Sequence, residues 1–203
     1  PLRAKKNVNL FSGSKSITIF FYFFNLNIDK CSKGIFYSNQ WSELPEKFNQ
    51  NNVKINWIHH FMTFNKMPNT KTALSFVNSF NTNSDKQGVH TFFESQLSLL
   101  LFIVVIKNYC KFFFKSFTYN KIKFAFKCED SNVNLWPILK DDWILSTRGG
   151  VVIRNLMFIE LVDKAIKKLP FQKNGLYLQE NQYWERALIH AWRLYGHGDI
   201  IGV

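Results

Sequence analysis

The apolar residues of this chain form short runs typical of strands, and between these runs they recur at helical spacing. This order is typical of an α/β fold. The run 16–24 (SITIFFYFF) is β-branched and aromatic throughout and does not alternate with polar residues, as is typical of a strand buried on both faces of a parallel sheet. The segment 54–61 (KINWIHHF) predicts a second strand. Between them, 42–48 (SELPEKF) predicts a helix with Ser42 near its cap and Pro45 in its first turn. Strand, helix and strand in this order predict a βαβ unit.

The middle of the chain is predicted to be mainly helical. Apolar residues at helical spacing predict one amphipathic helix inside the polar interval 65–86; they are Ala73, Leu74, Val77 and Phe80. A second long helix is expected to begin near Thr91 and to run through Tyr109 or beyond. The segment 121–127 alternates lysine with apolar residues, which predicts a short strand with one solvent-facing side.

The carboxy-terminal part predicts two helices and then a strand–helix–strand unit. The expected elements are helices over 135–146 and 150–169, a strand over 175–179, a helix over 181–195 and a strand over 199–203. Residues 1–14 are polar and basic, which predicts a loose lead-in. No repeat or low-complexity linker divides 15–203, so this range is expected to form a single Rossmann-like domain, a parallel sheet flanked by helices.

Composition supports a folded chain. Of the 203 residues, 46% are hydrophobic and 22 are Phe, which is too rich in core-forming side chains for a disordered protein. The longest apolar stretch, 97–106, is about half of the roughly 20 residues that a membrane-spanning helix needs. The three cysteines form no CxxC pair and no zinc-type cluster, which predicts plain thiols in a reducing compartment and no metal site.

The net charge of +12 favours anionic partners, namely nucleic acid, acidic lipid headgroups or phosphate-bearing substrates. Lys107, Lys111 and Lys115 lie four residues apart, with phenylalanines between them, and are expected to share one face of a helix. Such a face could contact an anionic membrane surface. The alternative is a solvated face above buried aromatic residues.

Candidate chemistry gathers where the strand over 175–179 ends and the next helix begins. Two carboxylates, Glu180 and Glu185, lie there among amide side chains that include Gln182. Open α/β sheets bind ligands at the edge where their strands end. Glu180 is expected in the turn itself, pointing into the crevice, and the two carboxylates need not act as a pair. The alternative for both is a carboxylate that stabilises the start of the helix.

Two further residues are candidates for substrate contacts. His59 follows at the carboxyl end of a predicted strand, and because neighbouring strand residues point to opposite faces, only one of His59 and His60 can face the cleft. Arg148, beside two glycines at a predicted helix start, could meet a phosphate or a sugar carboxylate; a solvated arginine is the alternative. The sequence contains no Walker loop, G-x-G-x-x-G, G-x-S-x-G or H-E-x-x-H, so those enzyme classes lose support.

Two segments resemble a known family. The segment 177–193 (YLQENQYWERALIHAWR), followed by Gly196 and by IIGV at 200–203, is similar to a pattern in bacterial surface-carbohydrate biosynthesis proteins. These are regarded as GT-B glycosyltransferases of lipopolysaccharide and capsule assembly, and their pattern is a strand, E-x-Q-x-W-E, an apolar helix, a glycine turn and a strand. The segment 34–45 (GIFYSNQWSELP), with NWIH at 56–59, resembles the amino-terminal part of that family. Tyr183 stands where the family more often has Gly or Pro.

The resemblance implies that the chain is the amino-terminal, mainly acceptor-binding half of a GT-B enzyme. Because the chain opens with Pro1 and stops before the family's next loop, we expect a fragment truncated before the donor-binding domain and inactive alone. Glu180 would be catalytic, orienting the acceptor hydroxyl or acting as base or nucleophile at the anomeric carbon. The other substrate-contact candidates are Gln182, Glu185, His59 and Arg148.

The same resemblance implies the partners. They are a nucleotide-sugar donor as co-substrate and a lipid-linked or growing glycan as acceptor, with no cofactor, no metal and no nucleic acid. The protein would be cytoplasmic and peripheral at the inner face of the cell membrane. The alternative function is a basic, non-enzymatic module that binds an anionic membrane surface or nucleic acid; it explains the charge but leaves Glu180 and Glu185 without a role.

Overall fold

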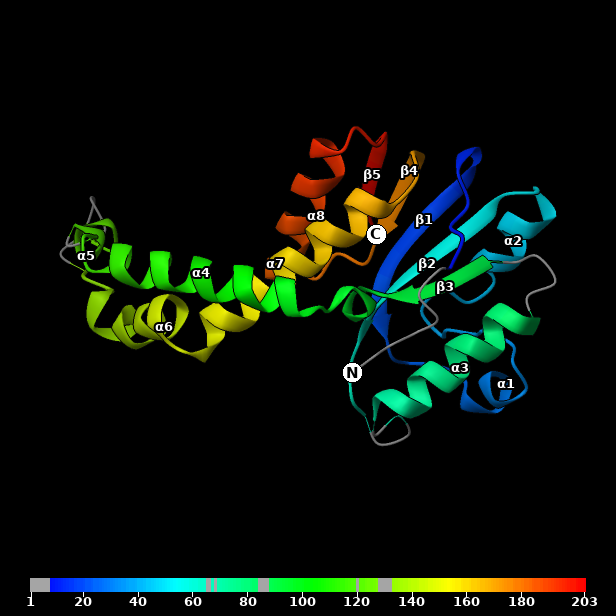
Figure 1. Ribbon diagram of the computed structural model, residues 1–203, viewed down its shortest axis with the longest axis horizontal. Coiled ribbons are helices and arrows are strands. Elements are labelled where there is room, and N and C mark those ends of the chain that lie inside the picture. Colours follow the sequence, from blue (N-terminus) through cyan, green and yellow to red (C-terminus); the bar gives the residue numbers. More distant parts are fainter. Residues whose placement is uncertain (1–7, 65–66, 68, 84–87, 120, 128–132) are drawn as a thin grey trace. The chain divides into compact units, whose positions relative to one another are not determined.

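The computed structural model describes residues 8–64, 67, 69–83, 88–119, 121–127 and 133–203. Within these residues the chain forms an all-parallel sheet of five strands in the order β3-β2-β1-β4-β5 (Figure 1). The strands are β1 (Gly13–Phe23), β2 (Lys54–Phe61), β3 (Gly88–Phe92), β4 (Gln172–Tyr177) and β5 (Asp199–Gly202). This is the strand order of a Rossmann-like fold. The predicted α/β class, with a Rossmann-like parallel sheet, is confirmed.

The helices of the described residues follow in chain order. They are α1 (Ile28–Ser32), α2 (Leu44–Gln50), α3 (Thr70–Asn83), the 3-10 helix η1 (Phe93–Gln96), α4 (Leu99–Ser116), α5 (Ile122–Ala125), α6 (Trp136–Arg148), α7 (Gly150–Lys168) and α8 (Tyr183–Leu194). The contacts between residues divide the chain into two compact units. We call 1–97 with 161–203 the sheet unit and 98–160 the helical unit; the boundary at Leu161 falls within α7. The sequence pattern indicated no such division.

The central strand β1 builds the core on both faces of the sheet. On one face, Phe21 and Phe23 pack with Trp57 of β2 and with the buried stripe of α3, as the helical spacing predicted. On the other face, the Phe20 ring meets the Trp192 ring of α8 edge-on, with centroids 5.8 Å apart. Burying one such side chain stabilises the fold by about 1.5–3 kcal/mol. The unalternating apolar run of β1 is therefore explained by burial on both faces.

Helix α8 lies in the strand–helix–strand unit that the sequence predicts at the carboxy-terminal end, and its packing explains the agreement. Trp184, Leu188 and Trp192 lie four residues apart on one face and are 2%, 0% and 0% exposed. Gly196, just after the helix, has a φ of +73°, a left-handed conformation that glycine adopts without strain. β4 and β5, which α8 connects, pair directly with each other. Core packing of both tryptophans, rather than exposure to a ligand, follows from these positions.

The long helix expected from Thr91 begins later. Residues 88–92 form β3, which pairs in parallel with β2 and shows alternating burial, and α4 starts only at Leu99 after a Ser98 cap whose hydroxyl accepts from the Leu101 N–H. The apolar run 97–106 dominated the prediction, whereas pairing with β2 decides the structure of the residues before it.

Two other expectations differ from the structure. The segment 121–127 forms no strand: residues 122–125 are the one-turn helix α5, and Lys127 makes an isolated bridge to Asn134. A seven-residue alternation distinguishes a strand from a helical turn only when a neighbouring strand pairs with it. The lead-in is tied to the sheet at Phe11, whose backbone N–H donates to Asn56 Oδ1 (2.8 Å) and whose carbonyl accepts from Gln172 Nε2 (2.6 Å). Residues 1–7 of the lead-in lie outside the described residues.

Candidate functional site

The topology places the candidate site between β1 and β4. From β1 the chain proceeds through β2 to β3 on one side of the sheet, whereas β4 and β5 lie on the other side of β1. The connections that leave the carboxyl ends of β1 and β4 therefore diverge, and ligands bind at such a switch point in open α/β sheets. The turn after β4, residues 178–182, carries Glu180. The fold thus brings the predicted carboxylate to the edge where this architecture binds ligands.

The Glu185 carboxylate forms hydrogen bonds with the backbone at the start of α8. Its side chain is buried, and one carboxylate oxygen accepts from the backbone N–H groups of Glu180 (2.8 Å) and Gln182 (2.7 Å). Gln182 is the N-cap residue of α8, and Glu185 completes a capping box three residues later. Asn181 between them has a φ of +58°, which asparagine tolerates better than most residues. The alternative weighed for Glu185, a carboxylate that stabilises the helix start, matches this geometry.

Glu180 is exposed to solvent in the same turn. Its carboxylate lies near the phenol of Tyr22 at the end of β1: burial raises the pKa of Tyr22 to about 12, and the negative charge of Glu180 contributes to the increase. The Tyr22 oxygen accepts a hydrogen bond of 2.6 Å from the Trp184 indole N–H. Of the two carboxylates in the predicted segment, Glu180 is the one available to a ligand.

The same edge of the sheet, at the carboxyl ends of β2 and β3, carries a histidine–carboxylate pair that the sequence did not single out. His60 Nδ1 lies 2.5 Å from Glu94 Oε1, and that oxygen also accepts from the Phe61 backbone N–H (3.1 Å). The His60 ring lies 5.3 Å from the Tyr22 ring. A carboxylate that orients an imidazole is a common arrangement for proton transfer. We call Tyr22, His60, Glu94 and Glu180 the edge cluster.

His59, the predicted substrate contact, lies on the opposite face of β2 and is 0% exposed. Its Nε2 is 3.0 Å from His90 Nδ1, and the two rings stack 5.3 Å apart among aromatic side chains. Burial and the neighbouring His90 lower the pKa of His59 well below its usual range, so the pair is neutral. A ligand at the sheet edge does not reach this side chain; the neighbouring His60 occupies the partly exposed position.

An apolar cavity of about 450 Å³ lies beside β4 in the sheet unit. Its lining residues are Gln40, Trp41, Leu44, Leu176, Leu178 and Val203. The Trp41 indole nitrogen is buried and has no hydrogen-bond partner within the described residues. A buried donor without a partner costs about 1–3 kcal/mol, and a ligand in the cavity could supply the missing acceptor. The segments 34–45 and 177–193 both contribute to this wall.

The remaining predicted residues belong to the helical unit. Arg148 is the last residue of α6, two residues before α7 begins at Gly150; its Nε donates to Ser116 Oγ (2.9 Å). Lys107, Lys111 and Lys115 are all exposed on α4. Of the described helices, none is long and apolar enough to cross a membrane. Nor do three metal-binding side chains of His, Cys, Asp or Glu come together anywhere in the described ranges.

Comparisons with protein-family models, with curated proteins and with solved structures find no match to this chain. What the site can do therefore follows from its own geometry and chemistry.

Proposed function

We propose that this chain is part of a glycosyltransferase that transfers a sugar from a nucleotide-sugar donor to a surface-glycan acceptor, and that its sheet unit holds the acceptor. The observation that carries the proposal is the position of Glu180, an exposed carboxylate at the switch point of a Rossmann-order sheet. The shared cavity wall of segments 34–45 and 177–193 supports it, since these segments carry the family resemblance.

The edge cluster supplies the groups that such a transfer needs. Glu180 would accept the proton of the acceptor hydroxyl or orient that hydroxyl toward the anomeric carbon. The His60–Glu94 pair offers a second proton-transfer group along the same edge. In the cavity, the Trp41 N–H and the Gln40 amide can bond to sugar hydroxyls, while the leucines cover the apolar faces of the sugar rings. Glu185 holds the turn in shape.

Glycan binding by the 203-residue chain tests the acceptor role. On an array of bacterial surface oligosaccharides, the chain is expected to bind a restricted set, and Glu180→Gln is expected to weaken that binding by about tenfold, the loss of one charged hydrogen bond. Asp199→Asn is the matched control, because it removes a carboxylate at the start of β5, the opposite edge of the same sheet. Equal binding by wild type and Glu180→Gln would refute the role of Glu180.

Trp41→Phe gives an independent readout. The substitution keeps an aromatic ring in the cavity wall and removes the N–H that has no partner among the described residues. We expect unchanged or increased stability together with weaker glycan binding. A loss of both stability and binding would indicate that Trp41 is only a packing residue. Absence of any glycan binding by the wild-type chain would refute the acceptor-binding proposal.

A second candidate function, contact with an anionic membrane surface, is favoured by one observation on α4. The exposed side of this helix carries an apolar stripe formed by Leu99, Phe102, Ile103, Ile106 and Phe114. Lys107, Lys111 and Lys115 flank this stripe, as expected of a helix that lies in a membrane interface. Such contact would hold the protein peripherally at the cytoplasmic face, near a lipid-linked acceptor. Vesicle sedimentation tests it: phosphatidylglycerol vesicles should bind the chain, and K107Q/K111Q/K115Q should abolish this binding.

A further inference from the structure

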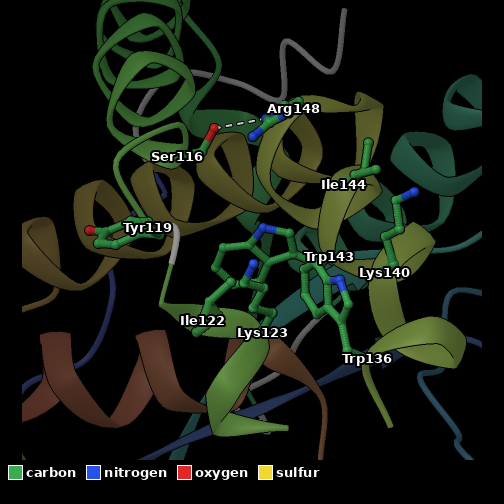
Figure 2. Close-up of a pocket in the computed structure, with 9 residues that line it drawn as sticks. All are labelled: Ser116, Tyr119, Ile122, Lys123, Trp136, Lys140, Trp143, Ile144 and Arg148. Carbon is green, nitrogen blue, oxygen red and sulfur yellow. Dashed lines mark hydrogen bonds between the residues drawn. The ribbon is translucent and has the colours of Figure 1, made fainter. Parts of the chain in front are cut away.

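The helical unit contains a cavity of its own, of about 420 Å³, which Figure 2 shows in close-up. The end of α4, α5 and α6 supply its walls. The lining residues are Ser116, Tyr119, Ile122, Lys123, Trp136, Lys140, Trp143, Ile144 and Arg148. The volume lies within the range of small-molecule sites in proteins, about 300–1,000 Å³. The cavity contains no residue of the edge cluster and belongs to a different unit of the chain.

The cavity is strongly cationic. Lys123, Lys140 and Arg148 line it, and no carboxylate does so within the described residues. In the part of the chain that the structure describes, none of these three cations forms an ion pair. Arg148 is held in place by its bond to Ser116 (Figure 2) and by its stacking over the Phe117 ring, 4.0 Å from the centroid. A fixed guanidinium with two lysines around one cavity favours an anion that accepts several hydrogen bonds.

The cavity is also aromatic. Trp136 and Trp143 are half-buried, and their indoles lie in the middle of the close-up (Figure 2). Tyr119 packs edge-on against Trp143, with centroids 6.4 Å apart and planes at 76°. Phe126 supports Trp136 at 5.9 Å. Because neighbouring rings hold these indoles, their orientation is restricted before any ligand arrives, which lowers the entropic cost of stacking a planar group on them.

We propose that this cavity binds a small ligand that joins a planar ring to a phosphate group, with the ring against Trp136 and Trp143 and the phosphate toward Arg148, Lys123 and Lys140. A phosphate suits three cations better than a carboxylate, since it carries up to two negative charges and three acceptor oxygens. The indoles of Trp136 and Trp143 offer faces on which a planar ring can stack. This inference is independent of Glu180 and of glycan transfer.

A series of three probes separates the two halves of the proposed ligand. By calorimetry, AMP contains both ring and phosphate, adenosine only the ring, and inorganic phosphate only the anion. AMP is expected to bind the full chain at least about tenfold more tightly than either part, since stacking of one base is worth about 1–3 kcal/mol. Phosphate binding as tight as that of AMP, or no AMP binding, would overturn the proposal.

Matched charge variants test the location. K123Q/K140Q should weaken AMP binding by about tenfold, whereas K107Q/K111Q, which removes two exposed lysines of α4 outside the cavity lining, should leave it unchanged. Equal losses in both variants would show non-specific charge attraction and refute the site. Trp143→Leu should weaken AMP and adenosine but not phosphate, with circular dichroism confirming the fold. If phosphatidylglycerol vesicles bind through Lys123 and Lys140 and AMP does not, the ligand is a lipid headgroup and the proposal fails.

Discussion

Glu185→Ala removes the carboxylate that closes the first turn of α8. One oxygen of this side chain accepts two backbone N–H groups, at 2.8 and 2.7 Å, and the residue is 5% exposed. Hydrogen bonds to a charged group contribute about 1.5–3 kcal/mol each, and favourable interaction with the helix terminus adds about 0.3–1 kcal/mol. Because Glu180 and Gln182 are exposed, water replaces part of the hydrogen bonding that their backbone N–H groups lose. We expect a net loss of about 2–3 kcal/mol in the free energy of unfolding.

This loss is measurable by urea unfolding followed by circular dichroism and by tryptophan fluorescence. For a chain of this size, about 2–3 kcal/mol corresponds to a fall of roughly 5–10 °C in melting temperature. Glu185→Gln should be milder, because its amide oxygen still accepts hydrogen bonds.

Glu180→Ala is the control in the same turn. Its side chain is exposed and forms no hydrogen bond in the described structure, so the change in unfolding free energy should stay within about 0.5 kcal/mol. Equal destabilisation by Glu180→Ala and Glu185→Ala, or an unchanged urea midpoint for Glu185→Ala, would refute the separation of the two carboxylates into an exposed and a structural group.

Three other outcomes follow from the packing of the sheet unit. Because burial raises the pKa of Tyr22 to about 12, the stability contributed by its neutral phenol is complete below pH 10 and is lost between pH 10 and about 12. Absorbance titration at high pH should show a phenol that ionises near pH 12, and the absence of such a phenol would contradict this environment. Burial lowers the pKa of His90 to about 3 and that of His59 well below 6.5, so stability from the neutral pair is complete above pH 6.5 and is lost as pH falls; NMR signals of both rings should not titrate near pH 6.5. Gly175→Ala places a methyl group 2.9 Å from the fully buried Trp192 ring and should cost about 1–3 kcal/mol in thermal or urea unfolding, whereas an unchanged stability would show that Trp192 moves freely.

The site combines elements that differ greatly in how readily a sequence indicates them. The segment around Glu180 was predictable, because a strand ending, a cluster of polar side chains and an amphipathic helix are all local features. The His60–Glu94 pair was not, since its members are separated along the chain and meet only because β2 and β3 are neighbours. A histidine and a carboxylate at the ends of adjacent strands are the signal for this pair, but the sequence predicts a helix from Thr91, where β3 ends.

The sequence by itself determined the elements whose signal is local. A continuous apolar run specifies β1, since a strand buried on both faces needs no polar side. Four-residue spacing of Trp184, Leu188 and Trp192 specifies α8, and Gly196 marks its end. In each case the residues that decide the structure lie within one or two turns of one another.

The tertiary structure decided what depends on distant partners. β3 is a strand because β2 offers it hydrogen bonds, and 122–125 is helical because no described strand pairs with it. Of the neighbouring residues His59 and His60, the direction of the β2 side chains buries one and brings the other to the edge. Glu180 and Glu185 differ in role because one turn exposes the first and folds backbone N–H groups around the second. The physical reason is that burial and hydrogen bonding of a side chain are set by the elements packed around it, which the local order of residues does not contain.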